Sequence, residues 1–244
     1  MNTRDHPFCL DSSLELYRGI DRRVLKEIAD QLSLENPEVK QREIRTILSH
    51  LPKDSQKSAR ILEVGCGYGR LAEEFLSMEG VSYTGIDFIE EYVDFCRRRF
   101  GQNETFILGD FQLTSIDSTF DVIVFPWLIL SRYSFAHQKQ MLTKAAEFLK
   151  SGQEAAYIAF DWMSIKYVQF ERVSQVTEEK EGQVVYTHVP HENKDATMPY
   201  YAAYLEHLVS IAESLNMDMQ TVDFSTAKQR KDYVFFILRS ENVG

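Results

Sequence analysis

Apolar residues recur along the middle of the chain with two periods, which indicate two kinds of element. Short apolar runs, typical of buried strands, lie at 60–65, 82–87, 105–109, 120–125 and 154–161. Segments with the 3.6-residue spacing of amphipathic helices lie between them, at 69–78, 90–100 and 136–150. This alternation predicts an α/β fold with a mostly parallel sheet and helices on both of its faces.

The pattern differs at the two ends of the chain. Ser12 and Glu15 form a capping-box pattern that predicts a helix over 13–32, and Asn36 before Pro37 predicts the start of a second helix. After residue 161 the alternation stops. The remaining patterns predict a hairpin at 168–176 and 183–189, a loop at 190–198, a helix at 199–215 and an antiparallel strand pair at 217–223 and 233–239.

Composition and charge narrow the class of protein. The chain has 244 residues, of which 44% are hydrophobic and 26% charged, and this suits a globular protein with a substantial core. Its formal net charge of −10 argues against nucleic acid as a partner, because binding a polyanion requires basic surface. The basic run 97–99 ends a predicted helix, where it complements the helix dipole.

The cysteines, the N-terminus and the longest apolar run indicate where in the cell the protein is found. Cys9, Cys66 and Cys96 are an odd, scattered set without metal-ligand spacing, which favours reduced thiols and no metal site. The polar N-terminus carries no apolar signal core. The longest apolar run, 122–130, contains Pro126 and is too short to span a bilayer. We therefore expect a cytoplasmic protein with no membrane partner, and the oligomeric state stays open.

The segment from 61 to 70, with the sequence ILEVGCGYGR, carries the strongest functional signal. Its glycines, Gly65, Gly67 and Gly69, follow a predicted strand and precede a predicted helix. Glycine allows a backbone to turn sharply and to lie against a ligand. A strand, a glycine loop and a helix in this order commonly hold a nucleotide-like cofactor. The dinucleotide fingerprint has its third glycine three positions after the second, whereas here the third follows after two.

With Glu63 placed two residues before its first glycine, this loop resembles the first motif of class I S-adenosylmethionine (SAM) dependent methyltransferases. Two further features lie where that family has them: a second strand that ends at Asp87 and a third that ends at Asp110. The resemblance covers about residues 58–161, with a weaker similarity at 217–239. It implies a Rossmann-like, mostly parallel seven-stranded sheet, SAM as the cofactor and methyl transfer as the reaction.

The resemblance also implies a layout for a single methyltransferase domain over residues 1–244. The expected parts are a helical N-terminal cap at 1–55, a SAM-binding core at 56–161, a lid insertion after strand five at 162–200, and a C-terminal helix and strand pair at 201–244. In this family, N-terminal helices and insertions after strand five commonly lie over the substrate.

Carried over to this sequence, the cofactor site lies at the carboxyl ends of the strands. Glu63 is expected to hold the loop near the amino-acid end of SAM, Asp87 to accept from the ribose hydroxyls and Asp110 from the adenine amino group. The other candidate contacts are Gly65, Cys66, Gly67, Gly69 and Arg70 in the loop, Phe88 and Phe111 beside the adenine, and Phe125 and Trp127 near the transferring methyl. Structural alternatives stay open: Asp87 as a helix N-cap, Asp110 as a turn residue, the aromatic residues as core, and Arg70 as a surface residue.

Methyl transfer from SAM is an in-line displacement, to which an enzyme mainly contributes proximity and orientation. An amine or hydroxyl acceptor also needs a general base. The candidates are His137, His188, Tyr200 and Tyr201, with Tyr133 and His191 in the same region, and each also fits a packing or surface role. Asp161 and Trp162, which end strand five, suit a cationic amine.

The residues after strand four constrain the acceptor. Methyltransferases that act on amino groups of planar substrates often have Asn/Asp-Pro-Pro-aromatic there, whereas this chain has Phe125-Pro126-Trp127. This departure weakens the case for nucleobase or glutamine-amide methylation. The first hypothesis is therefore methyl transfer to nitrogen or oxygen of a small molecule. The alternatives are a protein methyltransferase, a non-catalytic SAM-binding regulatory module and, more distantly, a dehydrogenase.

Overall fold

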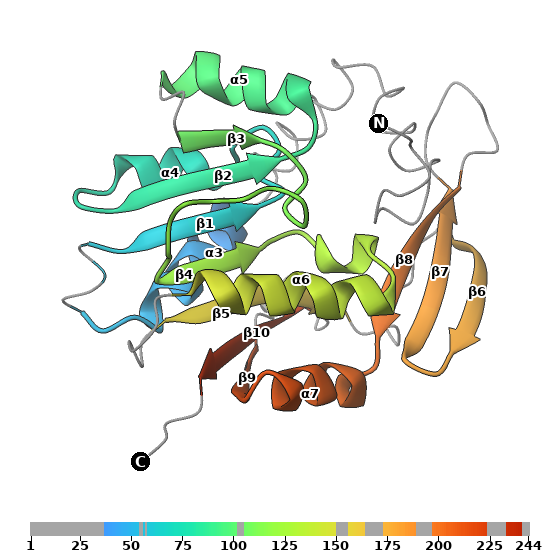
Figure 1. Ribbon diagram of the computed structural model, residues 1–244. Coiled ribbons are helices and arrows are strands. Elements are labelled where there is room, and N and C mark those ends of the chain that lie inside the picture. The colour runs from blue at the N-terminus through green and yellow to red at the C-terminus, as the bar shows by residue number, and fades with distance from the viewer. Residues whose placement is uncertain are drawn as a thin grey trace.

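The computed structural model describes residues 37–53, 56, 58–101, 105–149, 156–163, 173–188, 197–223 and 233–240. Figure 1 shows the arrangement of its elements. In chain order they are α3 (Pro37–Ser49), β1 (Arg60–Val64), α4 (Ala72–Ser77), β2 (Ser82–Asp87), α5 (Glu90–Phe100), β3 (Phe106–Leu108), β4 (Val122–Phe125), the 3₁₀-helix η4 (Leu130–Arg132), α6 (Phe135–Phe148), β5 (Tyr157–Met163), β6 (Val173–Glu179), β7 (Gly182–His188), β8 (Thr197–Ala203), α7 (Leu205–Ser214), β9 (Met217–Asp223) and β10 (Tyr233–Ser240).

The main sheet has seven strands in the described part of the chain, in the order β3-β2-β1-β4-β5-β10-β9. β1 pairs in parallel with both β2 and β4, whereas β10 runs antiparallel to β5 and β9. The strand order therefore reverses between β1 and β4. Ligands in open α/β sheets bind outside the carboxyl ends of the strands at such a reversal. The predicted fold class, including the terminal antiparallel pair, is confirmed.

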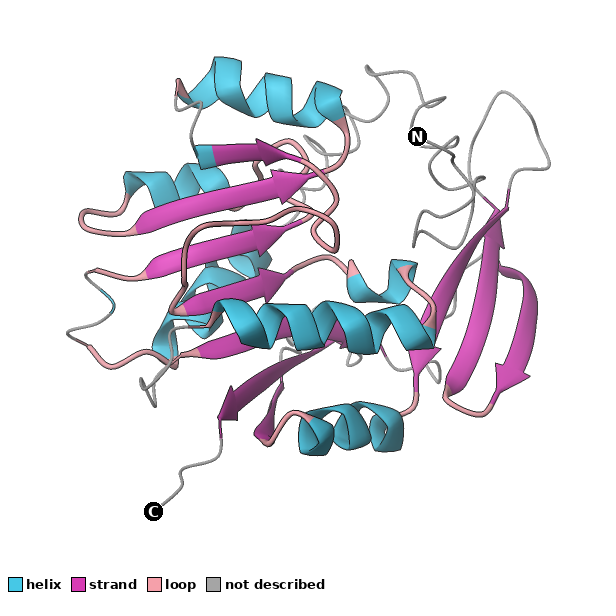
Figure 2. Cartoon of the chain, viewed as in Figure 1, coloured by secondary structure: helices cyan, strands magenta, loops and turns pink. Residues whose placement is uncertain are grey.

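Helices cover both faces of the main sheet (Figure 2). On one face, α6 and α7 pack over strand residues such as Leu62 and Ile123. On the other face, α3, α4 and α5 pack over residues such as Ile61 and Val122. Successive residues of a strand point to opposite faces, so a strand covered on both sides is apolar at nearly every position. This explains the short continuous apolar runs in the sequence.

The N-terminal elements agree with the sequence where the structure describes them. The helix predicted to begin at Pro37 is α3, and proline suits this position because the first helical turn leaves its N–H groups unpaired. The helix predicted over 13–32 lies outside the described residues. In the described segments, no helix has the length and apolar character needed to cross a membrane.

A smaller antiparallel sheet, β6-β7-β8, lies in the region where we expected an insertion after strand five. β6 and β7 form the predicted hairpin, with Lys180 and Glu181 at the turn, so the turn is tighter than predicted. Figure 1 shows this sheet beside the carboxyl ends of the parallel strands of the main sheet.

The helix predicted over 199–215 was wrong in its first part. Tyr200 and Tyr201 lie in β8, paired with Val185 and Val184 of β7, and α7 begins only at Leu205. Aromatic residues favour strands, and β8 is an edge strand of this sheet as described, where a proline is tolerated. The proline at 199 is therefore compatible with the strand, although it was interpreted as part of a loop and helix start.

Candidate cofactor and acceptor site

The glycine loop connects the end of β1 to α4 at the carboxyl edge of the sheet. All three of its glycines have positive φ, namely 75° at Gly65, 52° at Gly67 and 75° at Gly69. This left-handed region is unfavourable for residues with a Cβ atom. The loop is anchored to the neighbouring strand, because the backbone N–H groups of Gly65 and Cys66 both donate to the carbonyl of Ile86, over 2.8 and 3.2 Å.

The surroundings of the three glycines differ. A Cβ atom added to Gly65 would lie 2.6 Å from Cδ1 of Ile129, and one added to Gly69 would lie 2.7 Å from Cε2 of Phe100. A Cβ atom added to Gly67 would meet no described atom within 4 Å. Two of the glycines are therefore required by internal packing. Gly67 alone faces open space, which is what a loop that receives a ligand requires.

The carboxyl group of Glu63 is buried beneath this loop, with 2% of the residue exposed. The hydroxyl of Tyr83 donates to its Oε2. Burial raises the pKa of Glu63 to about 8, although the bond from Tyr83 and the charge of Arg70 act in the opposite direction. Burial thus favours the protonated form of Glu63 at neutral pH. Its hydrogen bond is with Tyr83 of β2, so its expected role in holding the loop stays a prediction.

Asp87 ends β2 and binds the same loop. Its Oδ2 accepts from the N–H of Gly67 and its Oδ1 from the N–H of Ile89, each over 2.9 Å. The N-cap alternative is wrong, because Ile89 is the N-cap residue of α5 and that helix has no side-chain cap hydrogen bond. A carboxylate accepts about four hydrogen bonds, so these two leave capacity for ribose hydroxyls. Burial raises the pKa of Asp87 to about 6 against the lowering effect of its backbone hydrogen bonds.

The two buried thiols of the site serve the packing of the loop. Cys66 lies against Gly85, where an added Cβ atom would come within 2.9 Å of its Sγ, and Cys96 donates to the carbonyl of Gly67 over 3.2 Å. The hydrogen bond with Cys96 and burial raise the pKa of the Cys66 thiol well above its usual range. Cys66 is therefore a neutral filler, and its side chain lies below the loop rather than on its open side.

Asp110 follows the third strand as predicted, but the neighbouring Phe111 belongs to the core. Asp110 is buried, and its Oδ1 accepts from the N–H of Gln112 over 2.8 Å, so the turn alternative is correct. Phe111 is only 3% exposed and packs on Phe125 and Phe148, with ring centroids 5.8 and 6.0 Å apart. The expectation that Phe111 lies beside the adenine was therefore wrong.

Two other predicted aromatic contacts differ from one another. Phe125 is fully buried, so it belongs to the core and not to the surface near the methyl group. Phe88 is partly buried and packs against the same core. Phe88 thus keeps some accessible surface directly after Asp87, and it stays a candidate contact, whereas Phe125 does not.

Arg70 was a candidate cofactor contact, with a surface position as the alternative, and the structure shows it in an ion pair with a buried glutamate. Its two terminal nitrogens bind the two oxygens of Glu43 in α3 over 2.9 and 2.7 Å. Glu43 is only 2% exposed. The guanidinium of Arg70 also lies over the ring of Trp127, 4.7 Å from its centroid. Arg70 therefore joins α3, the glycine loop and the segment after β4.

The segment after β4 has an unusual backbone. Trp127 and Leu128 have φ values of 59° and 58°, which non-glycine residues adopt only at a cost of about 1–3 kcal/mol each. The N–H of Leu128 donates to Oδ1 of Asp161 at the end of β5 over 2.7 Å, and Asp161 is 2% exposed. Trp127 is 38% exposed. Trp127 thus follows β4 at the carboxyl edge with part of its side chain accessible, and its place near the methyl group stays a prediction, whereas Asp161 supports this turn.

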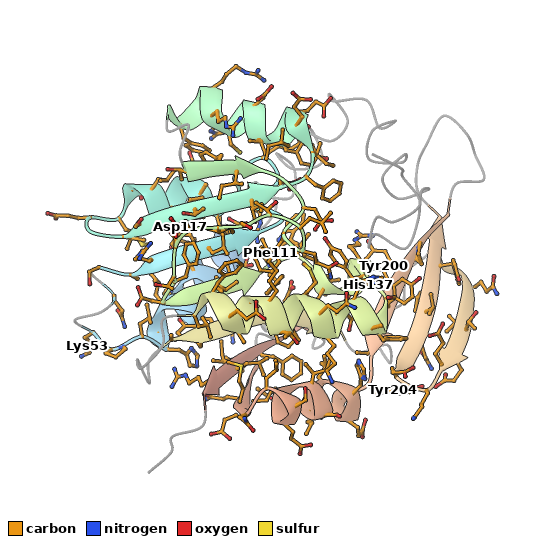
Figure 3. All side chains as sticks on the ribbon, in the orientation of Figure 1. Lys53, Phe111, Asp117, His137, Tyr200 and Tyr204 are labelled. Carbon is orange, nitrogen blue, oxygen red and sulfur yellow. The ribbon has the colours of Figure 1, made fainter. Side chains whose placement is uncertain are left out.

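The candidate bases lie on α6 and on the smaller sheet. His137 is in the first turn of α6, with its Nδ1 2.7 Å from Oγ of Ser134. Tyr201 packs edge-on against Phe135, and its carbonyl accepts from Gln138 over 2.9 Å, which joins β8 to α6. Tyr200 and His137 are both labelled in this region in Figure 3.

The structure describes some of the remaining candidate bases and not others. His188 is the last residue of β7, opposite Thr197 of β8. Tyr133 is buried in the core, so it is not a base. His191 lies outside the described residues. Sequence reasoning missed Arg132, whose guanidinium lies 3.8 Å from the centroid of the Tyr200 ring.

Comparison with known proteins is consistent with this geometry. A family profile described as a methyltransferase domain matches residues 61–152. Among curated relatives, the malonyl-[acyl-carrier protein] O-methyltransferase of Bacillus cytotoxicus is 35% identical over 98 residues, which are 37% of this chain and 34% of that protein. The fatty-acid O-methyltransferase of Mycolicibacterium smegmatis is 30% identical over 121 residues, 48% of this chain and 43% of that protein. The matches thus span less than half the length of these relatives.

Solved structures share the fold over a larger part of the chain. A SAM-dependent methyltransferase from Clostridium acetobutylicum superposes with a TM-score of 0.64 at 15% identity, and covers 89% of this chain and 98% of that one. A glycopeptide N-methyltransferase in complex with SAM superposes with a TM-score of 0.59 at 16% identity, over 82% and 86% of the two chains.

The profile match includes the glycine loop and both acids, and the fold is that of SAM-dependent methyltransferases of known structure. These similarities support the resemblance to class I SAM-dependent methyltransferases that the sequence indicated, with SAM as the cofactor of the similar proteins.

Proposed function

We propose that this protein transfers a methyl group from SAM to an oxygen or nitrogen of a small-molecule acceptor. The observation that carries the proposal is the open position at Gly67, within a loop whose other two glycines are closed by packing. The loop follows β1, one of the two strands between which the strand order reverses, and ligands bind at such a reversal in open α/β sheets.

The cofactor contacts that we propose follow from this position. The backbone at Gly67 lies against the methionine and ribose portions of SAM, and Asp87 accepts from the ribose hydroxyls. Asp110 accepts from the adenine amino group, with Phe88 beside the ring. When it is bound, SAM supplies an activated methyl group, and the chain contributes the positions of the two reactants.

Two observations support a small acceptor. The net charge of −10 does not favour a nucleic acid. The smaller sheet lies beside the carboxyl ends of the parallel strands, which suits a lid over a pocket (Figure 1). We propose that residues 162–200, together with the rest of β8, and the N-terminal cap form this cover in a single domain. Both curated relatives are named as O-methyltransferases, which favours oxygen over nitrogen as the acceptor atom.

Calorimetric titration of the purified chain with SAM, S-adenosylhomocysteine (SAH) and NADH tests the cofactor. We expect binding of SAM and SAH but not of NADH. Formation of SAH in the presence of candidate acceptors then separates an enzyme from a non-catalytic SAM-binding module. Binding of NADH without binding of SAM or SAH would refute the proposal and restore the dehydrogenase alternative.

A further inference from the structure

Arg132 lies where the segment after β4 meets β8, and none of the proposed cofactor contacts involves it. It ends η4, the 3₁₀-helix that follows the strained turn after β4. Ile129, at the start of η4, packs over Gly65 of the glycine loop. Residues three apart in a 3₁₀-helix lie on the same side, with a rise of about 2 Å per residue. Arg132 is therefore about one helical turn from the residue that contacts the cofactor loop.

The guanidinium of Arg132 stacks on an aromatic ring of β8. It lies over the ring of Tyr200 in β8, 3.8 Å from the centroid, and this contact orients its plane. Its Nη1 is buried and has no hydrogen-bond partner in the described parts of the chain. A buried donor without an acceptor is costly, more so on a charged group, and such a group in a native protein calls for a specific explanation.

A carboxylate satisfies this donor better than a neutral group. Arginine presents its N–H groups in a planar fork that matches a carboxylate, and hydrogen bonds between charged groups are about twice as strong as those between neutral ones. Arg132 as a residue is only partly buried, so its surroundings are not fully enclosed. Two buried carboxylates of the described chain already have partners: Asp161 binds Leu128, and Glu43 binds Arg70.

We infer that Arg132, oriented by Tyr200, binds the carboxylate of the acceptor, so that the protein methylates small carboxylic acids. This inference rests on the proposed function and specifies its substrate class. One carboxylate oxygen is held by the guanidinium, and the other attacks the methyl carbon of SAM. A carbon–oxygen bond forms, the methyl–sulfur bond breaks with its electron pair going to sulfur, and the products are a methyl ester and SAH.

This reaction also accounts for the candidate bases. A carboxylate is already anionic at neutral pH, so no proton has to be removed before attack. The negative acceptor and the positive sulfonium yield two neutral groups. His137, which is bonded to Ser134, is then not required as a base. If Arg132 binds the carboxylate, replacing it should weaken the binding of acids more than the binding of their uncharged amides. A residue with only a structural role would affect both to the same extent.

The test uses the full chain saturated with SAH and calorimetric titration with acetate, octanoate and benzoate and with their three amides. We expect at least one acid to bind at least tenfold more tightly than its amide. Arg132→Gln should reduce this preference on the order of 10- to 100-fold while SAH affinity stays unchanged. Arg132→Lys keeps the charge but loses the fork, and should retain a part of the preference. The control Lys139→Gln, which removes an exposed cation from α6, should retain all of it.

The outcomes are distinguishable. With SAM in place of SAH, mass spectrometry should find the methyl ester of the preferred acid. If no acid binds more tightly than its amide, or if Arg132→Gln retains the preference, the assignment of Arg132 is wrong, although SAM binding would still stand. If Arg132→Gln no longer folds, as judged by circular dichroism, the Lys variant decides. A chain that binds neither SAM nor SAH would instead overturn the proposed function.

Discussion

Replacement of Gly67 by alanine separates the cofactor role of the glycine loop from its role in packing. Gly67 has a φ of 52°, and a Cβ atom added there would meet no described atom within 4 Å. The added methyl group therefore costs stability only through backbone strain. A ligand that lies against the loop, however, would occupy the position of this methyl group. We expect Gly67→Ala to fold and to lose SAM affinity.

The magnitude follows from a matched position elsewhere in the chain. Gly101 caps α5 with a φ of 65°, and its added Cβ atom would likewise meet nothing within 4 Å of the described residues. A left-handed alanine costs roughly 1–2 kcal/mol, less the 0.4–1 kcal/mol gained from the stiffer unfolded chain. Both variants should thus lose about 1 kcal/mol of unfolding free energy. A methyl group forced into a packed contact costs about 1–3 kcal/mol, so SAM should bind Gly67→Ala about 10- to 100-fold more weakly.

Urea unfolding and calorimetric titration with SAM, applied to both variants and the wild type, measure the two effects separately. Gly65→Ala serves as a third case, because its Cβ atom would come within 2.6 Å of Ile129. We expect this variant to lose more stability than the other two. If Gly67→Ala binds SAM as tightly as Gly101→Ala does, then Gly67 does not face the cofactor and the site has been placed wrongly.

Three further predictions concern charged groups of the site. In the wild type, the folded chain keeps the proton of Glu63 to about pH 8, whereas the unfolded chain releases it near pH 4.5. The free energy of unfolding should therefore fall by up to about 1.4 kcal/mol per pH unit between these values. Glu63→Gln should remove this dependence, as urea unfolding at pH 5 and pH 8 would show. The affinity of the wild type for SAM should decline below about pH 6, as Asp87 becomes protonated. Calorimetry should find that Asp87→Asn binds SAM more weakly at pH 7.5 and that this affinity does not change with pH. An affinity equal to that of the wild type would contradict the assignment of Asp87 to the ribose. Arg70→Ala leaves Glu43 buried without its cation and should cost about 3–5 kcal/mol in urea unfolding. The exposed pair of Arg99 provides the control, because Arg99→Ala should cost less than about 1 kcal/mol, and equal losses would contradict the reasoning.

Much of the fold could be predicted from the sequence because its strands are buried on both faces. A strand such as β4, covered by helices on each side, is apolar at all of its positions and stands out from the amphipathic helices around it. The prediction failed at β8, where the tyrosines of an edge strand also fit the spacing of a helix. Short segments of this kind are decided by their partners, and the partner strand β7 cannot be identified from local sequence.

In the candidate site, too, features set by local sequence could be predicted, whereas those that depend on distant residues could not. The glycine loop, Glu63 and Asp87 could be located because they follow one another along the chain at fixed spacing. Arg70 and Arg132 could not be assigned, because their partners are distant in sequence: Glu43 lies 27 residues before Arg70. Phe111 and Phe125 were assigned to the ligand because strand ends lie near it, but a strand end also has a side that faces the core.

The segment after β4 depends on residues from three other parts of the chain. Its left-handed pair, Trp127 and Leu128, is unfavourable in isolation, so the turn must be held by its surroundings. Arg70 packs on Trp127 from the side of the glycine loop, and Asp161 binds Leu128 from the side of β5. Because Arg70 is itself fixed by Glu43, α3 contributes to the shape of the site without lying in the loop. α3 is therefore joined to the glycine loop through a buried ion pair, and a change in α3 that breaks this pair should disturb both the loop and the turn that leads to Arg132.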